Sequence, residues 1–277
     1  MSKDDFVGYA VPAITLSMGL LAWEGFVRYF AVPSYLLPAP SLIIATLITD
    51  WPTLGVKSCS LTLSPFFLHC LGSLWVTLTI TLEALLIAVV GSVALAIIFA
   101  QSRLVERAFY PFAVAMQVTP IVAIAPLLLI YLTPSVAVLV CAFLVAFFPL
   151  LANTTLGLSS ADHNLVDLFQ MYRASRIQQF MLLRLPSALP YFLAGLRISG
   201  GLALIGAIVA EIAAGSAGQG SGLAYRIVES GFRLNIPRMF AALLLISVAG
   251  ITIHLLLTAL SHWLLRDWHD SERGRES

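Results

Sequence analysis

The feature that most constrains the fold is a run of 54 residues, Ala108 to Ala161, that contains no Asp, Glu, Lys, Arg or His. A helix needs about 20 apolar residues to cross the hydrocarbon core of a bilayer, so the run is too long for one crossing. We predict two membrane-spanning helices, separated at the polar, proline-containing segment 131–135. Pro111, Pro120 and Pro126 fall in the first of these helices, and we expect them to kink it.

The rest of the chain is similarly apolar. Of its 277 residues, 60% are hydrophobic and only 10% are charged, whereas about a quarter of the residues of a soluble domain are charged. The predicted fold class is therefore all-α: a polytopic membrane protein with about six transmembrane helices. The other four spans are expected at Phe6–Trp23, Leu71–Ala100, Pro190–Ala214 and Met239–Leu265. A signal peptide is the alternative for the first, but two acidic residues beside Lys3 are unlike its basic start.

The composition excludes several functions. Lys3 and Lys57 are the only lysines, so the chain has no phosphate-binding Gly-x-x-x-x-Gly-Lys loop, and any ATP hydrolysis takes place on another chain. A net charge of +1 without a basic run argues against nucleic acid. Three cysteines cannot form a four-thiolate site, and His254 and His262 are too far apart on one helix to chelate a metal. We expect no catalytic residue, cofactor or metal on this chain.

One long polar passage, Ser160–Arg197, lies between apolar segments. Apolar residues recur within it at the spacing of a short amphipathic helix, with Asp162 as the candidate N-cap. They are Leu165, Leu168, Phe169 and Tyr172. A second apolar stripe follows and consists of Ile177, Phe180 and Met181. Because proline disfavours helix in the residue before it, we predict that the second short helix ends near Pro186 and that a new span begins at Pro190.

This passage resembles the cytoplasmic EAA loop of bacterial ABC importer permeases, in the nitrate, sulfonate and taurine branch. The Glu-Ala-Ala of that family falls on residues 167–169, and its glycine falls on Arg173. The resemblance implies an L-shaped pair of helices, here called the coupling loop (160–186), that docks on a separate ATPase subunit. The coupling residues it implies are Asp167, Leu168, Phe169, Tyr172, Arg173, Ala174 and Pro186. If the turn keeps a left-handed residue, Arg173 costs about 1 kcal/mol relative to glycine.

The resemblance extends from about Leu36 to Leu265 and implies the domain organisation. The segment Leu37-Pro-Ala-Pro-Ser41 resembles the external mouth of the same permeases, and Thr119–Leu127 resembles their Pro-x-x-Ala-x-x-Pro-Leu segment. We expect four parts: an N-terminal transmembrane helix (1–35), an external connector (36–70), a permease core (71–266) and a cytoplasmic tail (267–277).

The orientation follows from the positive charges. With the coupling loop in the cytoplasm, nine Lys and Arg residues lie inside and five outside, which agrees with the positive-inside tendency. Both termini are then cytoplasmic, in a bacterial inner membrane. The partners implied are cytosolic ABC ATPase subunits that hold ATP and Mg, a second permease copy, an extracytoplasmic solute-binding protein and the lipid bilayer.

Three charged residues fall within predicted spans: Glu83, Arg197 and Glu211. A charge in hydrocarbon is costly unless it is paired or faces water, so each is a candidate for the translocation pathway. For Arg197, snorkelling to the cytoplasmic interface is the alternative. Glu211 is expected near the outer end of its helix, as a water-exposed gate residue or an interfacial cap. We expect Glu83 to face the bundle interior or a dimer axis.

The expected function is translocation of a small organic solute, driven by a separate ATPase through the coupling loop. The alternative is a proton-coupled secondary carrier that uses Glu83 and Glu211, but the chain shows no internal repeat of the kind common in carriers. The spans contain no basic cluster for an anion, which favours a neutral or heteroaromatic solute such as a vitamin precursor.

Overall fold

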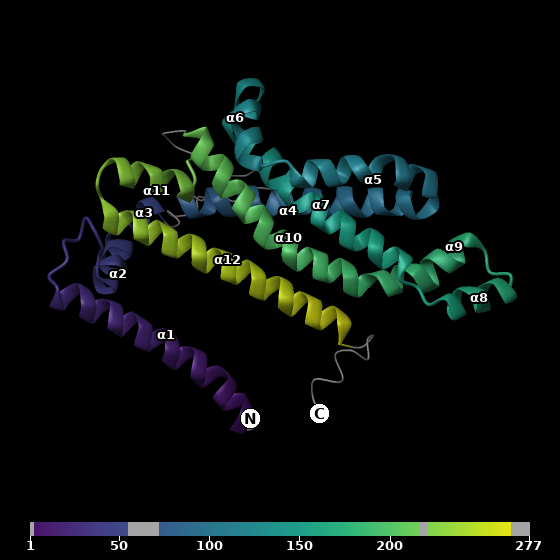
Figure 1. The fold of residues 1–277 in the computed structure, drawn as a ribbon, viewed down its shortest axis with the longest axis horizontal. Coiled ribbons are helices and arrows are strands. Elements are labelled where there is room, and N and C mark those ends of the chain that lie inside the picture. The colour runs from purple at the N-terminus through teal and green to yellow at the C-terminus, as the bar shows by residue number, and fades with distance from the viewer. Residues whose placement is uncertain (1–2, 55–71, 216–220, 267–277) are drawn as a thin grey trace, which may run out of the picture. The chain divides into compact units, whose positions relative to one another are not determined.

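The computed structural model describes residues 3–54, 72–215 and 221–266, and the regular structure in these ranges is helical (Figure 1). Five helices are long and apolar enough to cross a membrane, and a bent pair of helices brings the number up to six. The predicted all-α, polytopic membrane fold is therefore confirmed. The chain divides into two compact units, Met1–Trp75 with Ala217–Ile246, and Val76–Ser216 with Ser247–Ser277.

The first unit contains the N-terminal helix and the short helices that follow it. Its helices are α1 (Lys3–Tyr29), α2 (Pro40–Thr49), α3 (Trp51–Leu54), α11 (Leu223–Phe232) and the start of α12 (Ile236–Leu265). Helix α2 begins at Pro40, and the missing N–H of proline costs no hydrogen bond there, because the first N–H groups of a helix have no acceptor within it. The carboxylate of Glu24 joins α1 to α2, because it accepts hydrogen bonds from the hydroxyl (2.8 Å) and the N–H (3.1 Å) of Ser41. Residues 55–70 of the predicted external connector lie outside the described residues.

The second unit is built around the packed pair α7 and α10. Its helices are α4 (Ser73–Gln101), α5 (Arg103–Val118), α6 (Ile121–Tyr131), α7 (Pro134–Ser159), α8 (His163–Met171), α9 (Arg176–Gln179), α10 (Leu185–Ala214) and the end of α12. Gly206 on α10 lets two backbones approach, because a Cβ there would lie 2.9 Å from Ala142 Cα, and a Cβ on Gly200 would overlap the side chain of Leu257. Gly201 has no neighbour within 4 Å of such a Cβ.

The uncharged run of the sequence forms three helices. Helices α5 and α6 meet at Pro120 with a bend of 96°, so the predicted kink is confirmed there, whereas Pro111 and Pro126 lie inside their helices. Helix α7 begins at Pro134, within the predicted break.

The prediction that the second short helix ends near Pro186 and a new span begins at Pro190 is wrong. A continuous helical segment runs from Arg176 to Ala214, through a π-helical turn (η1) at Phe180–Arg184. The Leu185 N–H donates to the Phe180 carbonyl, five residues back, and this wider turn gives the ring of Pro186 room to follow without ending the helix. The π turn thus removes the local reason for the helix to stop.

Candidate coupling and translocation sites

Helices α8 and α9 lie beyond the end of α7 and the start of α10, within the second unit (Figure 1). Asp162 caps α8 as predicted, because its Oδ1 accepts a hydrogen bond of 2.9 Å from the Asn164 N–H. Helix α8 buries none of its residues within this chain. The amphipathic helix predicted from the spacing is therefore present, with its apolar face largely uncovered.

The end of α8 is a Schellman motif with arginine at the position that usually holds glycine. Arg173 has a φ of 52°, in the left-handed region. Its N–H donates to the Gln170 carbonyl (2.9 Å), and the Ala174 N–H donates to the Phe169 carbonyl (3.0 Å), the two bonds that define the motif. The turn therefore has the geometry of a glycine cap. Arg173 adopts the left-handed conformation whose energetic cost we expected from the resemblance to the EAA loop.

Helix α9 starts two residues later with a capping box. The Ser175 hydroxyl accepts from the Gln178 N–H (3.3 Å), and the Gln178 side chain accepts from the Ser175 N–H (2.8 Å). The Ser-x-x-Gln spacing of residues 175–178, which the sequence analysis did not use, is the signal that could have located this helix start. The Schellman motif that ends α8 is followed at once by the capping box that begins α9, and together they define the angle between the two helices.

Of the predicted coupling residues, four are exposed and three are partly buried. Asp167, Leu168, Tyr172 and Arg173 are exposed, and Phe169, Ala174 and Pro186 are partly buried. The structure places Pro186 on α10 instead of at the end of the loop. The other six residues lie on α8 and the turn after it.

The exposed apolar surface is larger than the predicted stripe. It comprises Leu165, Leu168, Met171, Tyr172, Ile177, Met181 and Leu182. Met171 and Leu182, which the periodicity did not select, are 82% and 67% exposed. Several exposed apolar side chains on a projecting pair of short helices are typical of a protein interaction site.

The intramembrane carboxylate of Glu211 is buried, with only 5% of the residue exposed. Thr77 on α4 donates a hydrogen bond of 2.8 Å to Glu211 Oε1. Of the two alternatives for Glu211, the water-exposed gate residue does not agree with this burial, and the interfacial cap stays a prediction. No sequence signal identified Thr77, because it lies 134 residues away along the chain.

The three intramembrane charges do not form one site. Arg197 lies 14 residues before Glu211 on α10, about 21 Å along the axis, and Glu83 lies six residues beyond Thr77 on α4, about 9 Å along. Glu83 and Arg197 are each partly exposed. Their assignment to a translocation pathway stays a prediction.

The first unit has two ion pairs within α11 and its C-cap and one that connects α12 with the end of α2. Glu229 on α11 lies 2.8 Å from Arg226 and 2.9 Å from Arg233, and Arg238 on α12 lies 3.4 Å from Asp50. The hydrogen bond from Arg226, with further attraction from the neighbouring arginines, lowers the pKa of Glu229.

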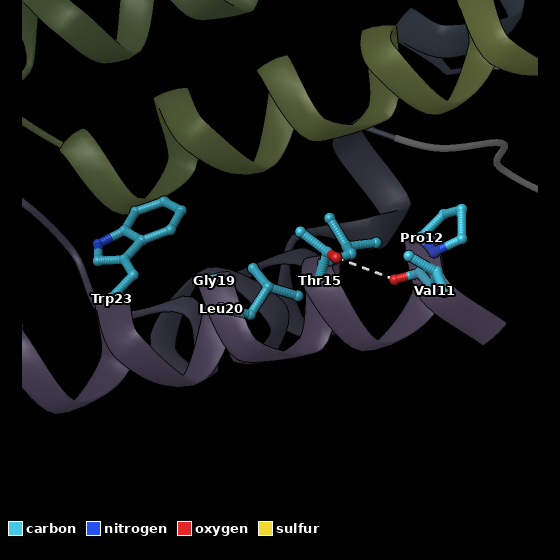
Figure 2. Close-up of a pocket in the computed structure, with 7 residues that line it drawn as sticks. Val11, Pro12, Thr15, Gly19, Leu20 and Trp23 are labelled. Carbon is cyan, nitrogen blue, oxygen red and sulfur yellow. Dashed lines mark hydrogen bonds between the residues drawn. The ribbon is translucent and has the colours of Figure 1, made fainter.

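The first unit also carries an apolar groove along α1, shown in Figure 2. Its lining includes Gly19, Leu20 and Trp23, and the Thr15 hydroxyl already donates to the Val11 carbonyl (2.9 Å). Among the described residues, no three His, Cys, Asp or Glu side chains are grouped as a metal site.

Known proteins resemble this chain over most of its length. Residues 88–267 match the family described as binding-protein-dependent transport system inner membrane component. The formylaminopyrimidine transport permease protein of Halalkalibacterium halodurans is 33% identical over 241 residues, which are 87% of this chain and 88% of that protein. The riboflavin transport system permease protein of Chloroflexus aurantiacus is 29% identical over 266 residues, 93% of this chain and 90% of that protein. A putative aliphatic sulfonates transport permease protein of Bacillus subtilis is 29% identical over 174 residues, 62% of this chain and 61% of that protein.

Proposed function

Because the chain belongs to the family of inner membrane components of binding-protein-dependent transport systems, we propose that it is the membrane-spanning subunit of an ATP-driven importer for a small heteroaromatic solute. The observation that carries this proposal is the projecting pair α8 and α9, which has a defined turn and an apolar surface that nothing in the described chain covers. A surface of this kind needs a partner, and a separate ATPase subunit is the partner that the family implies.

The helices beyond the turn are suited to transmit movement. The helical segment Arg176–Ala214 has 39 residues and is about 58 Å long, whereas a bilayer with its headgroups is about 40–45 Å thick. Displacement of α9 by the ATPase therefore acts directly on the membrane-spanning part of α10. ATP and Mg belong to that partner, and this chain needs no cofactor of its own.

The remaining partners complete the pathway. A second copy of the permease lies across the translocation axis, with Glu83, Arg197 and Glu211 near the path. A solute-binding protein docks outside, on the face that holds segment 37–41 and residues 215–238. The coupling loop and both termini then lie in the cytoplasm of a bacterial cell.

The proposed solute is neutral and heteroaromatic. Two relatives that align over most of their length are named for formylaminopyrimidine and riboflavin, both of which are nitrogen-containing ring compounds. The spans contain no cluster of basic residues that would hold an anion such as a sulfonate. Formylaminopyrimidine is the first compound to test.

The test is ATPase activity of the complex purified in lipid nanodiscs with its partner ATPase and binding protein. We expect binding protein loaded with formylaminopyrimidine to stimulate turnover, and Asp167→Lys or a combined Phe169→Ala, Tyr172→Ala variant to lose stimulation or assembly. Tyr131→Ala is the control for the tyrosine, because Tyr131 is 78% exposed and Tyr172 is 81% exposed, but Tyr131 lies at the end of α6. If no ATPase co-purifies and the loop variants still transport, the proton-coupled carrier becomes the better assignment.

A further inference from the structure

Two turns of the first unit end a helix with a left-handed residue that is not glycine. Ala31, after α1, has a φ of 49°, and Leu234, after α11, has a φ of 54°. Two main-chain hydrogen bonds complete a Schellman motif in each turn, as they do at Arg173. A left-handed conformation costs an L-residue free energy, so the surrounding fold has to hold each turn in place. Both turns therefore present the side chains beside them in a defined geometry.

Large apolar side chains lie exposed beside both turns. Phe232 is 86% exposed, and Tyr29 is 85% exposed. At the end of α1 the ring centroid of Phe30 lies 4.8 Å from that of Phe26 and 5.1 Å from that of Tyr29, so these rings form one cluster. We call the two segments, residues 26–36 and 232–234, the aromatic turns. Their other exposed apolar residues are Tyr35, Leu36 and Leu234.

The two aromatic turns lie at about the same depth. The Trp23 ring on α1 lies beside the Phe240 ring on α12, with centroids 6.1 Å apart, and α1 and the start of α12 run in opposite directions (Figure 1). Tyr29 ends α1 six residues beyond Trp23, which is about 9 Å along the axis. Ile236 begins α12 four residues before Phe240, which is about 6 Å along the axis. Because both distances run to the same side of the ring contact, the two turns emerge at one face of the membrane-spanning helices.

The helix lengths place this face in the headgroup layer of the bilayer. Helix α12 has 30 residues and is about 45 Å long, whereas a bilayer with its headgroups is about 40–45 Å thick. The turn 232–234 comes just before the first residue of this helix. The apolar stretch of α1, Ala10–Tyr29, ends within the other turn. Aromatic residues are enriched at this level of membrane proteins, because their rings suit the boundary between acyl chains and water.

Two features favour lipid over a soluble partner at the aromatic turns. An arginine beside each turn is already paired with a carboxylate one helical turn earlier: Arg28 lies 2.6 Å from Glu24, and Arg233 lies 2.9 Å from Glu229. Paired charges are accommodated among lipid headgroups and leave no free guanidinium to select an acidic protein surface. In addition, only 6% of the apolar stretch of α1 is buried within this chain, so the ring cluster at its end continues a surface that is open to lipid.

We propose that the aromatic turns form a lipid-binding surface at one membrane interface and seat the first unit in the bilayer. The rings of Phe30 and Phe232 contact the acyl chains next to the headgroups, and the Tyr29 hydroxyl and the two arginines lie among the headgroups. The inference goes beyond the proposed function, because it holds for any solute and any energy source. It also narrows the docking face proposed for the binding protein, since turn 232–234 falls within residues 215–238.

The experiment identifies what touches the turns by photo-crosslinking. Phe232→p-benzoylphenylalanine places a photoreactive aromatic side chain at an exposed position, and Phe30→p-benzoylphenylalanine does the same in the other turn. Tyr172→p-benzoylphenylalanine is the matched control, because Tyr172 is 81% exposed and also lies beside a left-handed residue, in the coupling loop. Each full-length variant is purified in nanodiscs of phosphatidylethanolamine and phosphatidylglycerol. The samples are illuminated with and without the partner binding protein, and the adducts are identified by intact-mass spectrometry.

We expect the yield of phospholipid adducts at Phe232 and Phe30 to be at least fivefold above that at Tyr172, and binding protein to change it less than twofold. Equal phospholipid yields at all three positions overturn the inference, because lipid contact is then no property of the aromatic turns. Adducts with the binding protein that replace the phospholipid adducts also overturn it and make the turns a docking site for that protein. Adducts between two copies of the chain overturn it as well, since the turns are then a contact between copies.

Discussion

Replacement of Arg173 by glycine tests the strain at the turn of the coupling loop. Arg173 has a φ of 52°, and its exposed side chain makes no hydrogen bond or ion pair with any residue in the described ranges. A left-handed conformation costs an L-residue about 1–2 kcal/mol, which glycine avoids. Glycine also lowers the stability of the folded state by about 0.4–1 kcal/mol, because it increases the conformational entropy of the unfolded chain. The net expectation for Arg173→Gly is a turn about 0.5–1 kcal/mol more stable.

Amide hydrogen exchange of the complex in nanodiscs measures this difference at the turn. A gain of 0.5–1 kcal/mol corresponds to about two- to fivefold slower exchange at residues 173 and 174, whose N–H groups make the two Schellman bonds. Arg173→Ala is the control, because it removes the charge but keeps the Cβ and therefore the strain. Equal slowing in both variants would show that the charge, and not the left-handed backbone, sets the stability of the turn. No slowing in Arg173→Gly would refute the strain argument altogether.

Three further predictions concern packing, pH and helix register. Gly206→Ala is expected to destabilise the second unit by about 1–3 kcal/mol in thermal unfolding, because the added Cβ would lie 2.9 Å from the backbone of α7. Gly201→Ala is the control and is expected to be neutral, because no atom lies within 4 Å of its added Cβ. Because the pKa of Glu229 is lowered in the folded protein, its ion pairs stabilise the fold fully at pH values above the unfolded pKa of 4.5, and this stability is lost as the pH falls through the folded pKa. Glu229→Gln is therefore expected to reduce the loss of thermal stability between pH 4.5 and the folded pKa. An unchanged profile of melting temperature against pH would contradict this. Arg184 lies in the π turn and is not part of the exposed apolar surface. Deletion of Arg184 is expected to convert the π turn to α-helix with the flanking helices still in register, and to retain most ATPase stimulation. Deletion of a residue inside α10 is expected to rotate its two halves by about 100° relative to each other and to abolish stimulation.

The sequence was sufficient for features that depend on local chemistry. Long apolar runs predict spans because the bilayer requires about 20 such residues, and α4, α7 and α12 occupy the expected segments. The sequence placed α8 correctly, from the apolar spacing of Leu165, Leu168, Phe169 and Tyr172 and from Asp162 as the N-cap. The same local signal failed at Pro186 and Pro190, where the preference of proline to end a helix was offset by a π turn that no short-range pattern reveals.

The tertiary structure decided everything that depends on which helix faces which. Pro111, Pro120 and Pro126 have the same chemistry, yet only Pro120 separates two helices of the described chain, at a bend of 96°. Glu211 is a charged residue by sequence, but its burial and its bond to Thr77 exist because α4 packs beside α10. Hydrophobic length and capping act over a few residues and can be read along the chain. Helix contacts join residues more than a hundred positions apart, and only the folded molecule shows which polar groups they bring together.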